Sequence, residues 1–268
     1  DRYQGPQGVD VSYYQPNFDW QAAASNGVVF GFARVSDGLN VVDDKFQRHW
    51  QGMKSNGIIR GAYQFFRPSQ DAAEQARLMA DKVGTLGDGE LPCVLDLERD
   101  EGVAPAQIAS KLRTWLEIVE RETGKTPIIY TTASFWESEV NSTDFSKYPL
   151  WAAHWGTNCP SVPRGWTDWT FWQYCNGDPE YCSNGEGFDR NVFDGSTSAL
   201  ESFADGGGAD YAAEFVEQSF PLASTAMEME AGETKSGYVE LRNTGEKEWN
   251  SETRLATTEP RDRESTFA

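Results

Sequence analysis

The stretch Leu91-Pro92-Cys93-Val94-Leu95-Asp96-Leu97-Glu98 is a short apolar run that ends in two carboxylates. Successive side chains of an extended strand point to opposite faces, so Asp96 and Glu98 share one face, and Leu95 and Leu97 share the other. In a parallel barrel the first of these faces points towards the axis, and active sites are built at the carboxyl ends of the strands. The alternative is a polar strand end whose acids meet only solvent or an arginine, which is the commoner case for an isolated Asp-x-Glu.

The rest of the chain surrounds this stretch with alternating strand-like and helix-like segments, a pattern typical of parallel strands in an α/β fold. The expected strands span 8–12, 28–35, 58–66, 91–98, 127–132, 150–155, 171–175 and 188–192. The expected helices span 18–26, 43–55, 70–83 (capped by Ser69), a segment between Pro105 and Gly124, and 135–140. The later connections are too short for full helices. We therefore predict an irregular (β/α) barrel of TIM type, followed by a short all-β appendage.

The composition changes near residue 200 and suggests three parts. Residues 1–203 form the predicted barrel, and 204–213 form a glycine-rich linker. Residues 214–268 alternate as β structure does, most clearly around Val239 to Arg242. An immunoglobulin-like sandwich needs about 100 residues, so these residues predict only a partial module of that kind.

The chain has 268 residues and a formal net charge of -19, which argues against nucleic acid as a partner because no basic stripe could contact phosphates. Charge alone would not attract it to anionic membranes or wall polymers either. No stretch is long and apolar enough to predict a membrane span. We expect a monomer.

Four cysteines are present, and the sequence favours one bridge among them. Cys175 and Cys182 flank a loop rich in turn-forming residues and are the favoured pair, with Cys159 and Cys182 as the alternative. Cys93 lies in the apolar strand and is expected to be a buried free thiol. No Cys-x-x-Cys pair or neighbouring histidine completes a zinc site, so we predict neither a metal nor a cofactor.

Three more acids lie at the ends of predicted strands: Asp10 ends the first, Asp37 follows the second and Asp189 lies at the last. Each alone would usually be a solvated turn residue. Closing a barrel makes the first and last strands neighbours, so Asp10 and Asp189 should join Asp96 and Glu98 at one mouth. Crowded carboxyl groups raise one another's pKa, so one of them can keep a proton near neutral pH. A proton donor beside a carboxylate is what glycosidic bond cleavage requires.

Other reaction classes lack their motifs. Neither of the two histidines, His49 and His154, has a nucleophile motif beside it, and the chain has no Gly-x-Ser-x-Gly and no phosphate-binding loop.

An ordered set of motifs across roughly residues 5–200 resembles glycoside hydrolase family 25, the Chalaropsis-type lysozymes. The motifs are Gly8-Val9-Asp10-Val11-Ser12-Tyr13-Tyr14-Gln15, Phe32-Ala33-Arg34-Val35-Ser36-Asp37-Gly38, Gly61-Ala62-Tyr63-Gln64-Phe65-Phe66-Arg67-Pro68, Leu95-Asp96-Leu97-Glu98, Pro127-Ile128-Ile129-Tyr130-Thr131-Thr132, Leu150-Trp151-Ala152-Ala153, Phe171-Trp172-Gln173-Tyr174 and Asp189-Arg190-Asn191.

The resemblance implies a muramidase that cuts the β-1,4 bond between N-acetylmuramic acid and N-acetylglucosamine in peptidoglycan. It makes Glu98 the proton donor and Asp96 a second carboxylate that stabilises a charged intermediate or a substrate acetamido group. Asp10 and Asp189 would complete the acidic floor of the site. Direct inversion and neighbouring-group participation both remain open as mechanisms.

The same resemblance predicts a sugar groove lined by Tyr63, Tyr130 and Trp151, with further substrate contacts from Gln64, Tyr14 and Asp37. Two of these positions depart from the family pattern, which more often has His in place of Gln64 and Glu in place of Asp37. The implied location is secreted, periplasmic or at the cell wall. The alternatives are a glycan-binding protein without turnover and an interaction module centred on residues 211–268.

Overall fold

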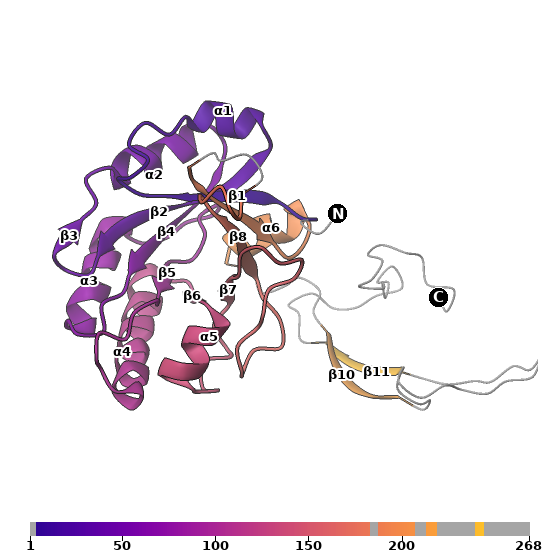
Figure 1. The fold of residues 1–268 in the computed structure, drawn as a ribbon. Helices are drawn as coiled ribbons and strands as arrows, with labels where there is room; N and C mark the ends of the chain where they lie inside the picture. The colour runs from indigo at the N-terminus through magenta and orange to yellow at the C-terminus, as the bar shows by residue number, and fades with distance from the viewer. Residues whose placement is uncertain (1–3, 183–186, 207–212, 219–238, 244–268) are drawn as a thin grey trace, which may run out of the picture. The chain divides into compact units, whose positions relative to one another are not determined.

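A computed structural model describes residues 4–182, 187–206, 213–218 and 239–243 (Figure 1). By its internal contacts the chain divides into two units, Asp1–Gly206 and Gly207–Ala268. The first unit contains the barrel. In the second, β10 (Ala213–Gln218) pairs antiparallel with β11 (Val239–Asn243). Most of the predicted partial sandwich lies outside the described residues, so that prediction stays a prediction.

Eight described strands of the first unit form a closed ring in the order β1-β2-β4-β5-β6-β7-β8-β9, and β9 pairs with β1. The strands are β1 (Gln7–Val11), β2 (Val28–Asp37), β4 (Ile59–Phe65), β5 (Val94–Asp96), β6 (Ile128–Thr131), β7 (Leu150–Ala153), β8 (Phe171–Asn176) and β9 (Asp189–Phe193). The predicted irregular α/β barrel is confirmed. One short strand is not predicted from sequence: β3 (Val41–Val42) pairs antiparallel with the carboxyl end of β2.

The last strand corrects the expectation of parallel pairing, because β9 runs antiparallel to both β8 and β1. No helix lies between Asn176 and Asp189 in the part of that connection that the structure describes. A parallel neighbour needs a crossover connection, usually helical, whereas a hairpin reverses the direction of the chain. As a result, the first residue of β9 lies at the mouth of the barrel, beside the carboxyl ends of the other strands.

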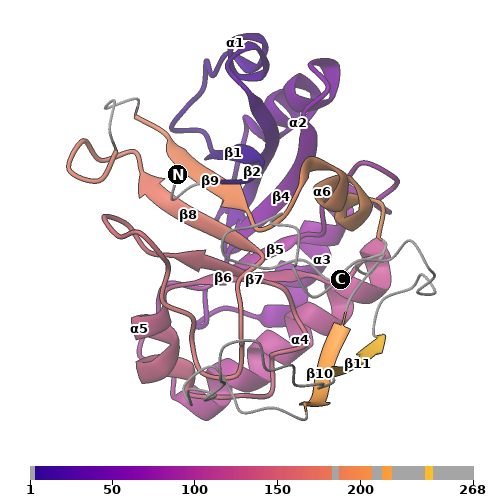
Figure 2. The same cartoon turned by 90° about the vertical axis from the view of Figure 1, so that its right-hand side faces the viewer.

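Helices cover the outside of the ring (Figures 1 and 2). They are α1 (Trp20–Ser25), α2 (Phe46–Ser55), α3 (Ala72–Val83), α4 (Pro105–Thr123), α5 (Ala133–Phe135), a π-helical turn (Trp136–Val140) and α6 (Thr197–Ala204). The cap of α3 is Asp71 and not the predicted Ser69, because the Asp71 side chain accepts a hydrogen bond from the Glu74 amide. The Ser69 hydroxyl instead donates to Glu101. Helix α6 is not predicted from sequence.

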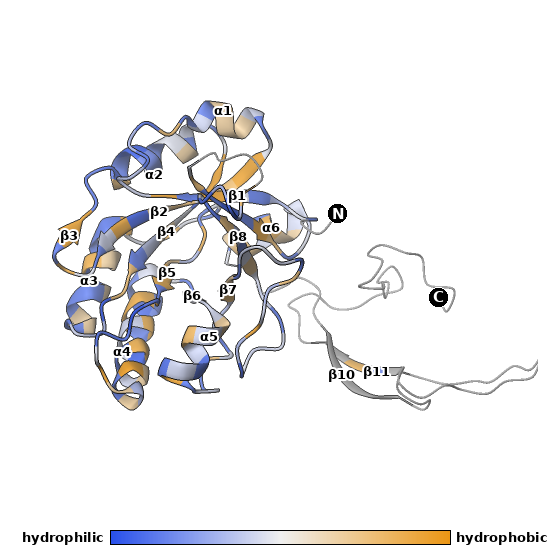
Figure 3. Ribbon diagram, in the orientation of Figure 1, coloured by the Kyte–Doolittle hydropathy of each residue, from blue (hydrophilic) through white to orange (hydrophobic). Residues whose placement is uncertain are grey.

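Two clusters of buried apolar side chains show which face of each strand points inward. The larger cluster lies between the strands and the helices and includes Leu95 and Leu97. The smaller one fills the barrel and includes Val94, so Asp96, two residues further on, also points inward. Around α4, apolar and polar residues alternate, as an amphipathic helix on a barrel requires (Figure 3).

One end of the barrel is closed and the other is open. Phe203 of α6 packs against Phe171, the first residue of β8, and Phe193, the last residue of β9. These residues mark the end of the barrel opposite the mouth, so α6 covers that end. Among the described helices, none is long and apolar enough to cross a membrane.

Candidate active site

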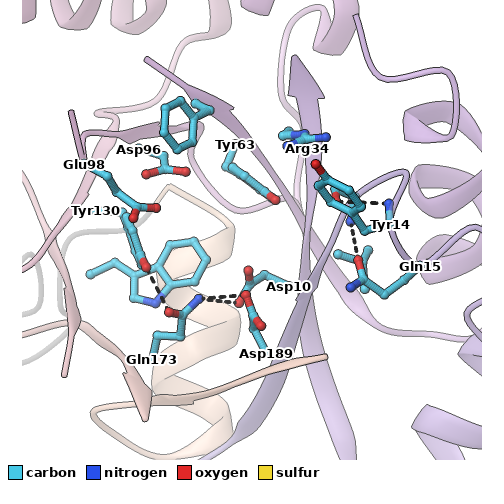
Figure 4. A pocket seen from close by; sticks show the side chains of 14 residues that line it. Asp10, Tyr14, Gln15, Arg34, Tyr63, Asp96, Glu98, Tyr130, Gln173 and Asp189 are labelled. Carbon is cyan, nitrogen blue, oxygen red and sulfur yellow. Dashed lines mark hydrogen bonds between the residues drawn. The ribbon is translucent and has the colours of Figure 1, made fainter. Parts of the chain in front are cut away.

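A cavity of about 300 Å³ opens at the carboxyl ends of the barrel strands (Figure 4). Asp10 of β1, Asp96 of β5, Glu98 just beyond β5 and Asp189 of β9 all line it. The remaining lining residues are Val11, Ser12, Tyr14, Gln15, Arg34, Tyr63, Phe65, Tyr130, Trp151 and Gln173. Barrel closure therefore brings together four acids that are far apart in the sequence.

Asp10 and Asp189 face each other across the β1–β9 pairing, where they are register partners. Burial raises the pKa of Asp10, and hydrogen bonds from Asn191, Gln173 and Asp189 act against that rise. Burial, followed by the charge of Asp10, raises the pKa of Asp189 to about 9. Of the two acids, Asp189 is therefore favoured as the one that keeps a proton near neutral pH.

Asp96 and Glu98 form a second pair of acids on the opposite wall. Burial raises the pKa of Asp96 well above its usual range, and the charge of Glu98 raises it further. Burial also raises the pKa of Glu98, while a hydrogen bond to Asp96 lowers it. Asp96 is 5% exposed and Glu98 is more accessible. Glu98 is therefore the acid of this pair that a molecule in the cavity can reach.

Two amide side chains connect the first pair of acids to the aromatic wall. Gln173 Nε2 donates to Asp10 Oδ2 at 3.0 Å and to Asp189 Oδ2 at 3.3 Å. Asn191 Nδ2 donates to Asp10 Oδ2 at 2.7 Å. No role is predicted for Gln173 or Asn191 from sequence, although each lies two residues from another inward-pointing side chain of its strand, a signal that could have placed them.

Aromatic side chains form the walls of the cavity. Tyr63, Tyr130 and Trp151 line it, as does Tyr14, which is 69% exposed at the rim. The Trp151 ring stacks on Phe32 with centroids 4.5 Å apart, so its orientation is fixed from beneath. Arg34 is the cation among the lining residues, and its Nε lies 3.3 Å from the buried carboxylate of Asp43.

The structure does not place Gln64 in the cavity, which corrects the predicted substrate contact. Gln64 is fully buried behind the barrel wall. Its Oε1 accepts from Trp115 Nε1 of α4 at 2.6 Å, and its Nε2 donates to Ser36 Oγ at 2.8 Å. Since Tyr63 faces the cavity, period-two alternation along β4 turns Gln64 to the helical side.

Asp37 is also absent from the lining of the cavity. It lies at the end of β2 and pairs with Arg67, whose Nη2 donates to Asp37 Oδ2 at 2.8 Å. Arg67 Nη1 also lies 3.0 Å from Glu101 Oε1. In this structure Asp37 therefore forms an ion pair at the rim, and its substrate contact stays a prediction.

The cysteines are the other reactive groups of the barrel unit. Cys175 and Cys182 form a disulfide, while Cys93 is a buried free thiol and Cys159 an exposed one. Among the described residues, no group of three or more His, Cys, Asp or Glu side chains is arranged to hold a metal ion. The chemistry that these residues can perform is proton transfer by carboxyl groups.

Comparison with known proteins gives a consistent relationship. The family model described as Glycosyl hydrolases family 25 matches residues 9–179. Lysozyme M1 of Streptomyces globisporus is 36% identical over 214 residues, which cover 75% of this chain and 71% of that protein. N,O-diacetylmuramidase of Chalaropsis sp is 31% identical over 215 residues, covering 75% and 99%. The crystal structure of the bacterial lysozyme from Streptomyces coelicolor aligns with a TM-score of 0.70 and 33% identity over 75% of this chain and 98% of that one. The chain therefore belongs to glycosyl hydrolases family 25.

Proposed function

We propose that the protein is a muramidase, which hydrolyses the β-1,4 bond between N-acetylmuramic acid and N-acetylglucosamine in peptidoglycan. The observation that carries the proposal is the group of four acids, Asp10, Asp96, Glu98 and Asp189, that line one cavity at the barrel mouth. Relatives named lysozyme and N,O-diacetylmuramidase support the choice of substrate.

Glu98 is the proposed proton donor. Its raised pKa keeps a population protonated where an ordinary glutamate would be ionised, and it is the more accessible acid of its pair. Protonation of the glycosidic oxygen lets the C1–O bond break and the leaving sugar depart as an alcohol. Water then adds at C1, and its proton passes to a carboxylate, so one water is consumed in each cleavage.

The other acids act on the positive charge that develops at C1. In its ionised form Asp10 supplies negative charge at the floor of the cavity, and the raised pKa of Asp189 favours Asp189 as the acid of that pair that keeps a proton. Asp96 lies beside Glu98 and either stabilises the charged centre or holds an acetamido group of the substrate. Both direct inversion and participation of the acetamido group use these residues in these places, and the anomer first released distinguishes the two routes.

The aromatic walls provide surfaces for the sugar rings. Tyr63, Tyr130 and Trp151 line the same cavity as the acids, and Tyr14 extends the wall to the rim. An aromatic face packs against the apolar face of a sugar, while the polar groups between the rings bind its hydroxyl and amide groups. Such a groove binds a glycan strand without needing a positively charged surface.

We further propose that residues 1–203 form the catalytic domain, 204–213 a linker and 214–268 a partial β-sandwich-like module. The division of internal contacts at Gly206 supports this arrangement. Because peptidoglycan lies outside the cytoplasm, we propose that the enzyme acts as a secreted, bacteriolytic protein in the cell wall or periplasm. A disulfide between Cys175 and Cys182 is consistent with that oxidising location.

Digestion of purified peptidoglycan tests the proposal. The products are reduced with borohydride, which marks every new reducing end, and are then identified by mass spectrometry. A muramidase yields reduced muramic acid at the new ends. Reduced glucosamine would identify a glucosaminidase instead. Binding to the wall without any released product would overturn the enzymatic proposal in favour of a glycan-binding protein.

A further inference from the structure

The side chain of Gln173 makes four polar contacts in the floor of the cavity, and those with Tyr130, Asp10 and Asp189 can be followed in Figure 4. Its Oε1 lies 2.8 Å from Tyr130 Oη and 3.0 Å from Trp155 Nε1. Its Nε2 lies 3.0 Å from Asp10 Oδ2 and 3.3 Å from Asp189 Oδ2. Gln173 is itself only 3% exposed, so water does not substitute for these partners.

The tryptophan determines which way the amide of Gln173 is turned. An indole Nε1–H can only donate, so the Gln173 atom that faces Trp155 must be the carbonyl oxygen. Tyr130 then donates its hydroxyl proton to the same oxygen. With both acceptor directions used, the amide nitrogen must face Asp10 and Asp189, and it presents one N–H to each acid.

Asn191 repeats the arrangement from the neighbouring strand. Trp151 Nε1 donates to Asn191 Oδ1 at 3.0 Å, which turns Asn191 Nδ2 towards Asp10 Oδ2 at 2.7 Å. Asn191 is fully buried. Two amides, each fixed by an indole that can only donate, therefore direct N–H groups at the same oxygen of Asp10.

Two N–H donors directed at one carboxyl oxygen stabilise the ionised form of that group, because a carboxylate only accepts hydrogen bonds. Asp10 and Asp189 also hydrogen-bond to each other, and that contact needs one proton on one of them. We propose that Gln173, assisted by Asn191, is a positioning residue that keeps Asp10 ionised and confines the shared proton to Asp189. The pKa of Asp189, raised to about 9 by burial and by Asp10, agrees with this placement.

This assignment matters for catalysis if the proposed function is correct, and to that extent it rests on that function. A proton that moved freely between the two acids would remove the negative charge of Asp10 for part of the time. Fixing the proton on Asp189 keeps that charge in one place next to the developing positive charge. The amides thus act through Asp10 and need not touch the substrate.

The test replaces Gln173 by Glu, which keeps the shape and the acceptor oxygen but removes both N–H donors. The matched control is Gln64→Glu, since Gln64 is equally buried and also accepts from a tryptophan Nε1, yet donates to Ser36 rather than to an acid. Carbon NMR follows the titration of the aspartate carboxyl groups, with Asp10→Asn and Asp189→Asn variants identifying their signals. This measurement needs no turnover.

In the wild type, we expect Asp10 to ionise first and Asp189 to keep its proton past neutral pH. In Gln173→Glu the ionisation of Asp10 should move up by at least about one pH unit, a tenfold change in proton affinity. The acidic limb of the kcat/KM profile should move by the same amount. In Gln64→Glu, neither the ionisation of Asp10 nor the acidic limb of the kcat/KM profile should move. Should Gln173→Glu not fold, Trp155→Phe removes one donor that orients the amide and should shift both measurements in the same direction.

The inference is overturned if Asp189 ionises before Asp10 in the wild type, or if the titration of Asp10 is unchanged in the folded Gln173 and Trp155 variants. It is also overturned if Gln64→Glu shifts Asp10 as much as Gln173→Glu does. Failure of the wild type to cleave peptidoglycan would contradict the proposed function alone, because the NMR titration would still decide where the proton resides.

Discussion

Arg67 and Asp37 form a two-point ion pair across the ends of β4 and β2, with Nη2 donating to Oδ2 at 2.8 Å and Nε contacting Oδ1. The other guanidinium nitrogen of Arg67 binds Glu101, which follows Glu98 in the loop after β5. Glu101 has a left-handed backbone, with φ at 51°, and its carboxylate also accepts from the amide and hydroxyl of Ser69. The pair therefore anchors the loop that carries the proposed proton donor.

Replacing Arg67 by Met should release this anchor. We expect kcat to fall about tenfold, because a small displacement of Glu98 increases the distance between its carboxyl group and the glycosidic oxygen. The cost in the free energy of unfolding should stay near 1 kcal/mol, since the pair is partly exposed. Arg113→Met is the matched control, because Arg113 also pairs with an aspartate, Asp144, and lies over a phenylalanine ring. An equal loss of kcat in both variants would show that the anchor has no particular role.

Replacing Glu98 by Gln should remove the proton donor while keeping the shape of the side chain. We expect kcat to fall by at least about 10³-fold, because general acid catalysis contributes on this scale. Binding to insoluble peptidoglycan, measured by co-sedimentation, should persist, since the aromatic walls are unchanged. Glu117→Gln on the exposed face of α4 removes the same charge away from the cavity and should leave activity intact. Activity retained in Glu98→Gln would transfer the role of acid to Asp96.

The inward and outward faces of the opening strand could be predicted from sequence, because period two alone separates Asp96 from Leu95 and Leu97. The neighbouring positions of Asp10 and Asp189 followed from closing a ring. The direction of β9 could not be predicted, since it depends on a connection without a crossover helix. Alternation along β8 could have placed Gln173 inside the barrel, but its role depends on the partners Asp10, Asp189 and Trp155, which only the folded chain brings to it.

The outward position of Gln64 could have been predicted from the sequence. The alternation that separates Asp96 from its neighbours also places Tyr63 and Gln64 on opposite faces of β4, so only one of them could face the cavity. The motif of the resemblance placed both in the groove. When a motif assigns two adjacent residues of one strand to the same site, the alternation of side chains along the strand decides which of them can face it.

Gln64→Leu tests that correction. It leaves Trp115 Nε1 buried without its acceptor, so the free energy of unfolding should fall by about 1–3 kcal/mol, while KM for peptidoglycan stays unchanged. Tyr63→Phe, one residue earlier in β4, should show the opposite pattern, with a higher KM and a smaller change in stability. Urea unfolding and steady-state kinetics on both variants measure the contrast. A raised KM in folded Gln64→Leu would return Gln64 to the substrate groove.

Asp189 makes stability depend on pH in a direction opposite to that of an ordinary ion-paired aspartate. Its pKa is about 9 in the folded protein, against roughly 4 in an unfolded chain. Between these values the folded state binds the extra proton, so the contribution of Asp189 to stability is complete below about pH 4 and is lost as the pH rises towards 9.

Asp189→Asn should remove that dependence, because an amide stays neutral at every pH while keeping a donor and an acceptor. We expect the variant to gain on the order of 4 kcal/mol over the wild type between pH 5 and pH 8, measured by urea unfolding at both values, because the wild type loses about 1.4 kcal/mol per pH unit over this range. The remaining acids titrate in both proteins, so the difference between them isolates Asp189. Asp10→Asn is the contrasting variant: its carbonyl oxygen can still accept from Gln173 and Asn191, but its side chain carries no negative charge, so activity should be lost. Parallel pH curves for the wild type and Asp189→Asn would show that the proton resides elsewhere in the cluster.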